Sequence, residues 1–304
     1  MNLTSQYIVN PKSRYAYSTS LVTYTSIRPS SAKLRLGDDR QVLNDKKKYK
    51  IFRLDNIEFK MIRCPIGMFT MGADDQTDNP KRWGVIENPF LLGETEVTQE
   101  LFEKVMGFNP SGFQEYPNLK QSPVERVTWY DALMFCNRLS ERCKKKPYYN
   151  ISSVRYGQAE EGEEGEESEN IEEAYVTINP QANGFRLPFE KEWEYAAKAG
   201  TNNQWAGTND ENKVGEVAWF DDNSEDETHP VKCKRPNEWG FYDMTGNVWE
   251  WCWDTYEEQS DHGVFRGGSC IHETMDLRSV VRGTSSLDTV INTIGFRISA
   301  SLFN

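Results

Sequence analysis

The amino-acid sequence predicts an α+β fold with little regular secondary structure, in which helices and short strands are joined by long irregular connections. Three observations predict it. Polar and apolar residues alternate through "FRLDNIEFKMIRCPIGMFTMGA", as in short strands. Apolar residues recur at helical spacing in "TEVTQELFEKVMGF" and in "TWYDALMFCNRLSERC". From Gly200 onward the chain is rich in Gly, Asn, Asp and Trp, which indicates long connections that aromatic side chains pin to a core.

The composition indicates a globular protein and excludes several functions. Of the 304 residues 37% are hydrophobic, and nine are Trp. A net charge of −12 and a pI near 4.9 argue against nucleic-acid binding, which needs clustered Lys and Arg to neutralise phosphates. No apolar run approaches the roughly 18 residues of a membrane span, and the first residues lack the apolar centre of a signal peptide. Six cysteines and three histidines support neither a disulfide framework nor a zinc site.

In chain order, residues 1–50 are polar and are expected to form an N-terminal extension. The alternating segment from Ile51 is expected to form two short strands with a turn near Gly67. The first helix should begin at Thr98, which has the acidic residues of a helix start after it. The second should end before the basic run 144–146, which suits the negative pole of a helix.

The segment Gly157–Ala174, "GQAEEGEEGEESENIEEA", is expected to be a mobile surface loop, because its like charges repel and almost nothing in it is apolar. Calcium sequestration is the alternative for this tract. A short strand at Phe185–Leu187 is then stopped by Pro188. A further helix carries Trp193 on its apolar face and should end at Gly200.

Several segments occur in the same order as in the formylglycine-generating enzyme (sulfatase-modifying factor) family, and the chain resembles that family from about Phe59 to Ser299. The segments are "GMFTMGA", "ETEVTQELFEKVMG", "SPVERVTWYDALMFCNRLS", "GFRLPFEKEWEYAAKAG", "GFYDMTGNVWEWCWD", "FRGGSC" and "IGFRIS". The resemblance implies one domain over residues 51–304 with a large variant of the C-type lectin fold, in which two main helices accompany small antiparallel sheets.

The residues after Ser269 depart from the enzymes of that family. Formylglycine-generating enzymes bind copper through two cysteines that follow this segment, but here only Cys270 is present and no cysteine follows it. A copper(I) site needs two thiolates within reach of each other. Related sulfoxide synthases use a three-histidine iron site and an additional helical domain; His229, His262 and His272 show no ligand spacing. We therefore expect a protein that is not an enzyme and requires no cofactor, with a copper oxidase or an iron-dependent sulfoxide synthase as the alternative.

The segment from about 270 to 293, here called the variable segment, resembles the variable region of diversity-generating retroelement proteins of the Treponema variable protein type. Fixed family residues remain at Leu277, Arg278, Ser279, Arg282 and Ile294, while the residues between them are ones that an Asn codon yields when its adenines are randomised. Lys, Glu, Gln, Met and Trp, which such a codon cannot yield, are missing from Leu277 to Thr293. Glu273 and Met275 fall outside this set and would be fixed or templated differently. The predicted ligand-binding residues are Cys270, Ile271, His272, Thr274, Asp276, Val280, Val281, Gly283, Thr284, Ser285, Ser286, Asp288, Thr289, Val290 and Ile291.

The resemblance implies that the partner is an unidentified protein or cell-surface ligand, bound by side chains on a stiff scaffold, much as antibody loops bind antigen. It also implies a cell-surface location through a lipid anchor on a leader that this sequence does not contain; the residues themselves leave a cytoplasmic location open. Two alternatives remain at this stage. The variable segment is an ordinary surface loop of a diverged relative, or the protein is a structural paralogue that binds nothing through it.

A calcium site is the one metal site that the resemblance implies. Its ligands would be the carboxylates of Asp243 and Glu250 and the main-chain carbonyls of Gly246 and Val248, which are hard oxygen donors. The first position is Asn in the family. A hydrogen-bonding role for the same residues is the alternative.

Overall fold

The computed structural model describes residues 48–113, 119–158, 167–256 and 259–302. Its largest sheet begins with a hairpin of β1 (Tyr49–Leu54) and β2 (Ile57–Cys64). The expected break between two strands near Gly67 is present, since β2 ends at Cys64 and the next strand begins at Gly67, but these two strands do not pair with each other and the hairpin turn lies earlier. The chain reverses at Asp55 and Asn56 instead, where Asp55 takes the left-handed conformation (φ 54°) that short acidic and amide residues tolerate. The predicted extension up to residue 50 overlaps β1, and residues 1–47 lie outside the described residues.

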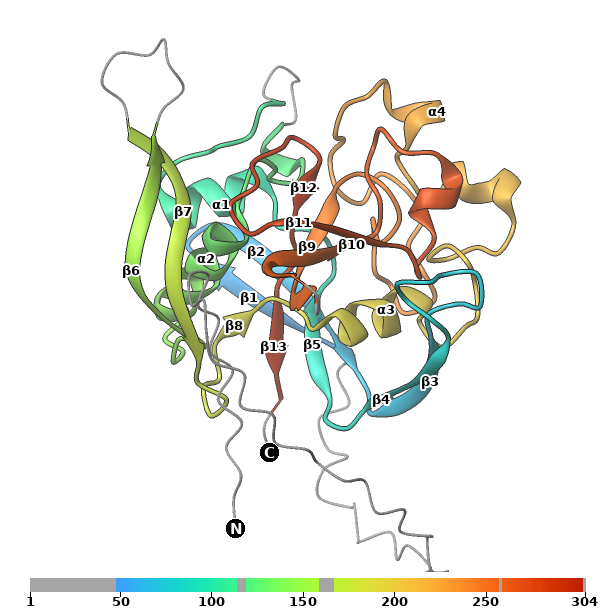
Figure 1. The fold of residues 1–304 in the computed structure, drawn as a ribbon, viewed down its shortest axis with the longest axis horizontal. Helices are drawn as coiled ribbons and strands as arrows, with labels where there is room; N and C mark the ends of the chain where they lie inside the picture. The colour runs from blue at the N-terminus through green and yellow to red at the C-terminus, as the bar shows by residue number, and fades with distance from the viewer. Residues whose placement is uncertain (1–47, 114–118, 159–166, 257–258, 303–304) are drawn as a thin grey trace, which may run out of the picture.

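The five strands of this sheet come from distant parts of the chain, in the order β1-β2-β5-β13-β8. All neighbouring pairs are antiparallel. The remaining three strands are β5 (Phe90–Gly93), β8 (Phe185–Arg186) and β13 (Ser299–Ser301). Because β13 lies between β5 and β8, the last residues of the domain complete the sheet that its first residues begin (Figure 1).

A second sheet carries the variable segment. Its order is β11-β10-β9-β12, so β11 (Arg282–Ser286) is an edge strand. β9 (Trp249–Tyr256) and β10 (Gln259–Arg266) form its centre, and β12 (Ile294–Gly295) runs parallel to β9. Two further pairs stand apart. They are β3 (Gly67–Met71) with β4 (Arg82–Ile86), and β6 (Tyr149–Gln158) with β7 (Glu167–Ile178).

The strand β7 corrects the interpretation of the acidic tract. Residues 159–166 lie outside the described residues, but 167–174 are paired in a strand and are not a loop. The negative charge of this part is partly neutralised, because Arg155 on β6 pairs with Glu172 and Glu173. Ile171 is buried, and its amide donates to the buried carboxylate of Asp131 (2.9 Å). A cross-strand arginine and one apolar anchor thus outweigh the repulsion that the sequence indicated.

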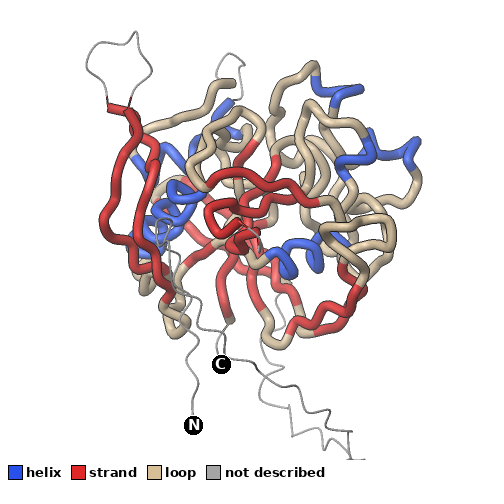
Figure 2. Tube along the Cα trace, in the orientation of Figure 1, coloured by secondary structure: helices blue, strands red, loops and turns tan. Residues whose placement is uncertain are grey.

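The predicted helices are present. α1 (Gln99–Met106) begins at Thr98, whose hydroxyl accepts from the amide of Leu101, and it ends at Gly107. α2 (Trp129–Arg142) has a capping box of Thr128 and Asp131. α3 (Glu190–Lys198) ends at Ala199 and Gly200, which both have positive φ. Shorter helical turns are η2 (Leu119–Gln121), η3 (Glu211–Glu216), α4 (Asp221–Ser224) and η4 (Thr274–Leu277). Loops make up much of the remainder (Figure 2).

The main core lies where α1 and α2 meet the two sheets. Phe102, Phe135 and Phe296 contact one another there, with ring centroids 5.2–6.3 Å apart. A second cluster surrounds Trp193 of α3, and a third lies below the variable segment and includes Leu277. No helix within the described ranges has the length and apolar character needed to cross a membrane.

Candidate functional site

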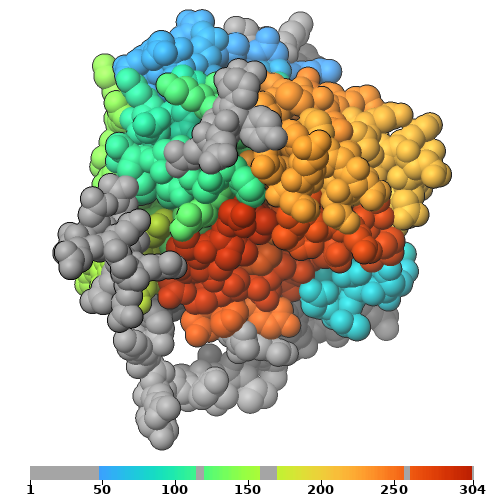
Figure 3. All heavy atoms as spheres, turned by 90° about the horizontal axis from the view of Figure 1, so that it is seen from above, coloured from blue at the N-terminus to red at the C-terminus, as the bar shows by residue number. Residues whose placement is uncertain are grey.

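The variable segment connects β10 to β12 and includes η4, β11 and the loop that follows β11. In the view from above, the red end of the chain forms a continuous band open to solvent (Figure 3). Four buried or half-buried arginines are here called the framework arginines: Arg278 and Arg282 lie within this segment, and Arg266 and Arg297 flank it. Their contacts determine the path of its main chain.

Arg266 fixes the centre of the segment from below. Its side chain is fully buried and forms ion pairs with Glu190 (3.0 Å) and Glu194 (2.5 Å) of α3. The same guanidinium donates to the main-chain carbonyls of Ser279 (2.6 Å) and Val280 (3.3 Å). The planar fork of arginine donors allows one side chain to join a helix to a loop in this way.

Arg278 and Arg282 attach the segment to the loop between β3 and β4. Arg278 pairs with Asp75 (2.7 Å), and Arg282 donates to the carbonyl of Asp78 (2.7 Å) and also pairs with Glu190. From the other side, Asn79 donates to the carbonyl of Val280 (2.8 Å). The sequence did not predict that the loop between β3 and β4 supports the variable segment. Nothing in the local spacing of this loop relates it to residues about 200 positions later in the chain.

Arg297 fixes the C-terminal end of the segment. Its guanidinium forms a two-point pair with Glu250 (both contacts 2.6 Å) and donates to the carbonyls of Gly93 and Tyr242 (3.0 Å each). At the other end of the segment, Leu277 packs against Gly268, where a Cβ would lie 2.2 Å from the Leu277 Cδ2 atom. The predicted fixed positions are therefore interior contacts.

Between these supports most of the predicted binding residues reach the surface. Ile271, Val290 and Ile291 are exposed apolar residues, with 47%, 36% and 43% of their surface accessible. The exposed polar members are Asp276, Thr284 and Asp288. The half-buried members are His272, Thr274, Val281, Gly283, Ser285, Ser286 and Thr289. This arrangement places a mixed polar and apolar patch on a fixed main chain.

Two predicted binding residues lie in the interior and are corrections to that set. Cys270 is fully buried; its amide donates to the carbonyl of Asn247 (2.9 Å) and its carbonyl accepts from the hydroxyl of Ser224 (2.7 Å). Val280 is 7% exposed, and its carbonyl is held by Asn79 and Arg266. Both belong to the scaffold, since side chains without access to solvent cannot contact a partner in this conformation.

The chemistry at Cys270 is that of a buried thiol. Burial raises its pKa to about 12, so the thiol form predominates at neutral pH and the metal-binding thiolate is scarce. The histidines have separate partners: His272 lies 2.6 Å from the Ser269 hydroxyl, His229 stacks on Trp219, and His262 contacts Asp261. Across the described residues, no three His, Cys, Asp or Glu side chains converge to hold a metal ion.

The residues expected to bind calcium fit an ion only in part. Asp243 is buried, and its Oδ1 atom has no hydrogen-bond partner among the described residues. Burial raises the pKa of Asp243 to about 6. The Glu250 carboxylate, in contrast, is bound by Arg297 and by the indole nitrogen of Trp193 (2.7 Å). Of the expected ligands, Asp243 thus keeps an unpaired oxygen, whereas the Glu250 carboxylate is already paired with Arg297.

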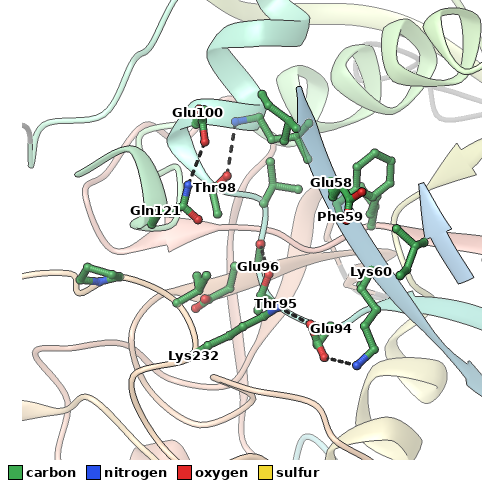
Figure 4. A pocket seen from close by; sticks show the side chains of 18 of the residues that line it. Glu58, Phe59, Lys60, Glu94, Thr95, Glu96, Thr98, Glu100, Gln121 and Lys232 are labelled. Carbon is green, nitrogen blue, oxygen red and sulfur yellow. Dashed lines mark hydrogen bonds and ion pairs between the residues drawn. The ribbon is translucent and has the colours of Figure 1, made fainter. Parts of the chain in front are cut away.

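Glu96 adds a second unpaired buried oxygen near this group. Burial, together with the negative charges of Asp243 and Glu250, holds the pKa of Glu96 well above its ordinary value, and its Oε1 atom has no hydrogen-bond partner in the described part of the chain. Glu96 also lines a cavity of about 760 Å³ between β2, β5 and the start of α1 (Figure 4). There Glu94 pairs with Lys60 (2.6 Å) and with Lys232. No residue of the variable segment lines this cavity.

Comparison with known proteins decides the family. Residues 53–302 match the sulfatase-modifying factor enzyme 1-like domain. The chain belongs to the sulfatase-modifying factor family. It is similar to the solved structure of Treponema denticola variable protein 1, with 32% identity and a TM-score of 0.73 over 84% of this chain and 100% of that one. The predicted C-type lectin fold of this family, and the resemblance to a variable protein, are confirmed by these two matches.

Other relatives in the sulfatase-modifying factor family differ in function. The chain is 41% identical to the chaperone protein LppX of Paenibacillus barcinonensis over an alignment of 182 residues that covers 54% of this chain. It spans 62% of the length of that relative. It is 26% identical over 277 residues to the inactive C-alpha-formylglycine-generating enzyme 2 of Bos taurus, covering 79% of this chain and 87% of the relative. Active formylglycine-generating enzymes are also related. Membership in the family therefore does not imply catalysis.

Proposed function

We propose that this protein displays a diversified ligand-binding surface on its C-type lectin scaffold, and that its variable segment arose by retroelement mutagenesis. The observation that carries the proposal is the division between the framework arginines, which hold the main chain through buried ion pairs and carbonyl contacts, and the exposed side chains between them. The likeness to a variable protein supports it.

The physical reason is tolerance to substitution. Exposed substitutions cost little stability, usually less than about 0.5 kcal/mol, when the main chain does not depend on them. Here the main chain depends on Arg266, Asn79 and Leu277. Randomising the adenines in the codons of the exposed positions would leave these three residues unchanged. The exposed side chains can then differ freely and set the choice of partner.

The partner is proposed to be a protein or another ligand at a cell surface. Ile271, Val290 and Ile291 would supply apolar contacts, and Asp276 and Asp288 would supply charged ones at the rim. A relative that is named a chaperone protein supports a protein partner, and a relative that is named inactive supports a role without catalysis. A lipid anchor that holds the protein at the cell surface belongs to the same proposal.

A structural calcium ion is a further part of the proposal. The unpaired Oδ1 atom of Asp243 and the carbonyls of Gly246 and Val248 would hold it, and the nearby carboxyl of Glu96 would ionise more readily once a cation is bound. The ion would strengthen the scaffold below the variable segment and would take no part in catalysis.

The diversification is tested by comparing the coding sequence of Arg266–Arg297 with the neighbouring DNA. The proposal expects a near-copy in which adenines replace bases at the exposed positions, while the codons of the framework arginines agree. Absence of any such copy would contradict retroelement origin.

The binding surface is tested with a displayed library in which Ile271, Thr284, Asp288, Val290 and Ile291 are randomised. We expect most members to fold and binders to be recovered against a chosen protein. A parallel library at Leu277, Val280 and Ser279, which are buried, is the control and should mostly fail to fold. Equal failure of both libraries would contradict the proposal.

The enzymatic alternative has its own test. The protein is loaded with copper and incubated with a cysteine-containing sulfatase peptide, and the peptide is analysed for conversion of cysteine to formylglycine. We expect no turnover. Turnover that disappears in Cys270→Ser would overturn the non-catalytic assignment.

A further inference from the structure

The two-stranded ribbon of β3 and β4 presents one face to the protein and one to solvent. In its register Met68 lies opposite Val85, and Thr70 lies opposite Trp83. Because side chains alternate along a strand, these four residues point to the same side, and Ile66 continues their row just before β3. Figure 1 shows the ribbon at the margin of the molecule.

The inner face of the ribbon packs against α3. Phe69 contacts Tyr195 of α3, with ring centroids 5.1 Å apart. Gly84 lies against Phe69 so closely that a Cβ would be 2.4 Å from its ring. Met71 and Ile86 are buried on the same side. The orientation of the ribbon is therefore fixed by α3.

The outer face is strongly apolar although it is open to solvent. Trp83, Met68, Ile66 and Val85 are 72%, 65%, 63% and 41% exposed. Single exposed apolar residues are normal on a protein surface, but a contiguous group that includes a tryptophan marks an interaction site. None of these residues belongs to the variable segment, so the surface would be common to all variants.

The charges at the two ends of this face identify its occupant. Trp83 and Val85 form the outward row of β4, and the exposed residues Lys81 and Glu87 follow at the same spacing, one residue beyond each end of the strand. The row is basic at one end, apolar in the middle and acidic at the other. Two such rows that run antiparallel are complementary, because Lys81 of each copy then meets Glu87 of the other. Lys81 forms an exposed ion pair with Asp74 (3.0 Å), and losing such a pair costs little free energy.

We infer that two copies of this chain associate through the outer faces of β3 and β4 about a twofold axis between Trp83 and Val85. The face consists of two short strands, which is small for a stable dimer, so the association is weak and depends on concentration. If the proposed ligand binding holds, pairing would present two variable surfaces together and raise the avidity for a multivalent partner. That consequence depends on the proposed function; the pairing itself does not.

The test is sedimentation equilibrium of the full chain over a range of concentrations from micromolar to millimolar. The wild type should move from 35.2 kDa toward twice that mass. Trp83→Ser should weaken the association about tenfold or more. Ile51→Ser is the matched control, since Ile51 is 51% exposed on another strand, and it should associate like the wild type. A wild type that stays monomeric throughout, or a Trp83→Ser variant that associates equally well, overturns the inference.

Charge exchange tests the antiparallel geometry without removing any apolar residue. Lys81→Glu alone and Glu87→Lys alone each place like charges at both ends of the interface and should each weaken association. An equal mixture of the two variants restores opposite charges at both ends and should recover it. A mixture no better than either variant alone overturns the twofold arrangement. No ligand enters these measurements, so a monomeric result would leave the proposed binding function standing.

Discussion

At the scale of single residues, the buried arginines decide the form of the candidate site. Arg266 and Arg297 have no exposed surface, and each is held by carboxylates and by main-chain carbonyl oxygens. Burying a charge is costly unless it is paired and fully hydrogen-bonded. Both guanidinium charges are paired with carboxylates, although the Nε atom of Arg266 has no hydrogen-bond partner among the described residues. The pairs therefore serve less to add net stability than to fix one arrangement of the chain around the two arginines.

Arg266→Met should be strongly destabilising because it leaves Glu190 and Glu194 buried with one cation fewer. We expect a loss of about 3–5 kcal/mol in the free energy of unfolding, measured by urea denaturation. Arg53→Met is the control, since the pair of Arg53 with Glu58 is exposed and should contribute almost nothing. Similar losses for both variants would show that Arg266 is not a scaffold residue.

Glu125 should make stability depend on pH. Burial raises the pKa of this carboxyl from 4.5 to about 7, so the folded state holds the proton more tightly than the unfolded state does. Its stabilising contribution is full below pH 4.5 and is lost as the pH rises through 7. Between these values the wild type should lose on the order of 3 kcal/mol in its free energy of unfolding relative to Glu125→Gln. Denaturation curves at several pH values test this, and parallel pH profiles for the two proteins would refute it.

Calcium should raise the melting temperature of the wild type if Asp243 holds an ion. A ligand that binds only the folded state stabilises it in proportion to the logarithm of its concentration. We expect an increase of a few degrees with calcium, a smaller one with magnesium at the same concentration, and neither in Asp243→Ala. No increase in the wild type would favour the hydrogen-bonding alternative for these residues.

At the scale of elements, the edge strand β11 and its flanking loops combine exposed positions with buried ones. Exposure alternates irregularly here: Leu277 and Leu287 are buried, while Thr284 and Ile291 are open. The sequence pattern predicted which positions were fixed but not which of the others faced inward. Val280 shows why, since a small β-branched residue suits both a varied surface and a core.

The cost of a substitution in this element, measured as the free energy of unfolding, should depend on whether the side chain is exposed or buried. Thr284→Asn, Val290→Asn and Ile291→Asn should each change the free energy of unfolding by less than about 0.5 kcal/mol. Leu277→Ala should cost about 2–5 kcal/mol, because Leu277 is fully buried against Gly268. Thermal denaturation of the four variants measures this. A cost at Ile291 as large as that at Leu277 would contradict a tolerant surface.

At the scale of the whole molecule, the C-terminal strand holds the main sheet together. β13 pairs with β5 on one side and β8 on the other, so removing residues 299–304 would leave β8 without a partner and would expose one edge of β5, which would then pair with β2 alone. We expect this deletion to abolish the cooperative thermal transition. Deletion of residues 1–47, which precede the family match at residue 53, should leave the melting temperature unchanged and would support the predicted extension. A large loss from the second deletion would contradict that division.

The sequence by itself determined the family, the helices and the fixed positions of the variable segment, because each is recorded in local spacing: Thr98 before an apolar stripe, the Gly and Arg residues around "RGGS", and the ordered motifs. Only the tertiary structure decided that β7 is a strand, that the hairpin turns at Asp55 and that Cys270 and Val280 are buried. It also decided that Asp75, Asp78 and Asn79 support the site, and that the outer face of β3 and β4 is exposed. These features depend on contacts between residues far apart in the chain, such as the ion pairs that Arg155 and Arg278 form. Local composition does not show which distant residue will be the partner.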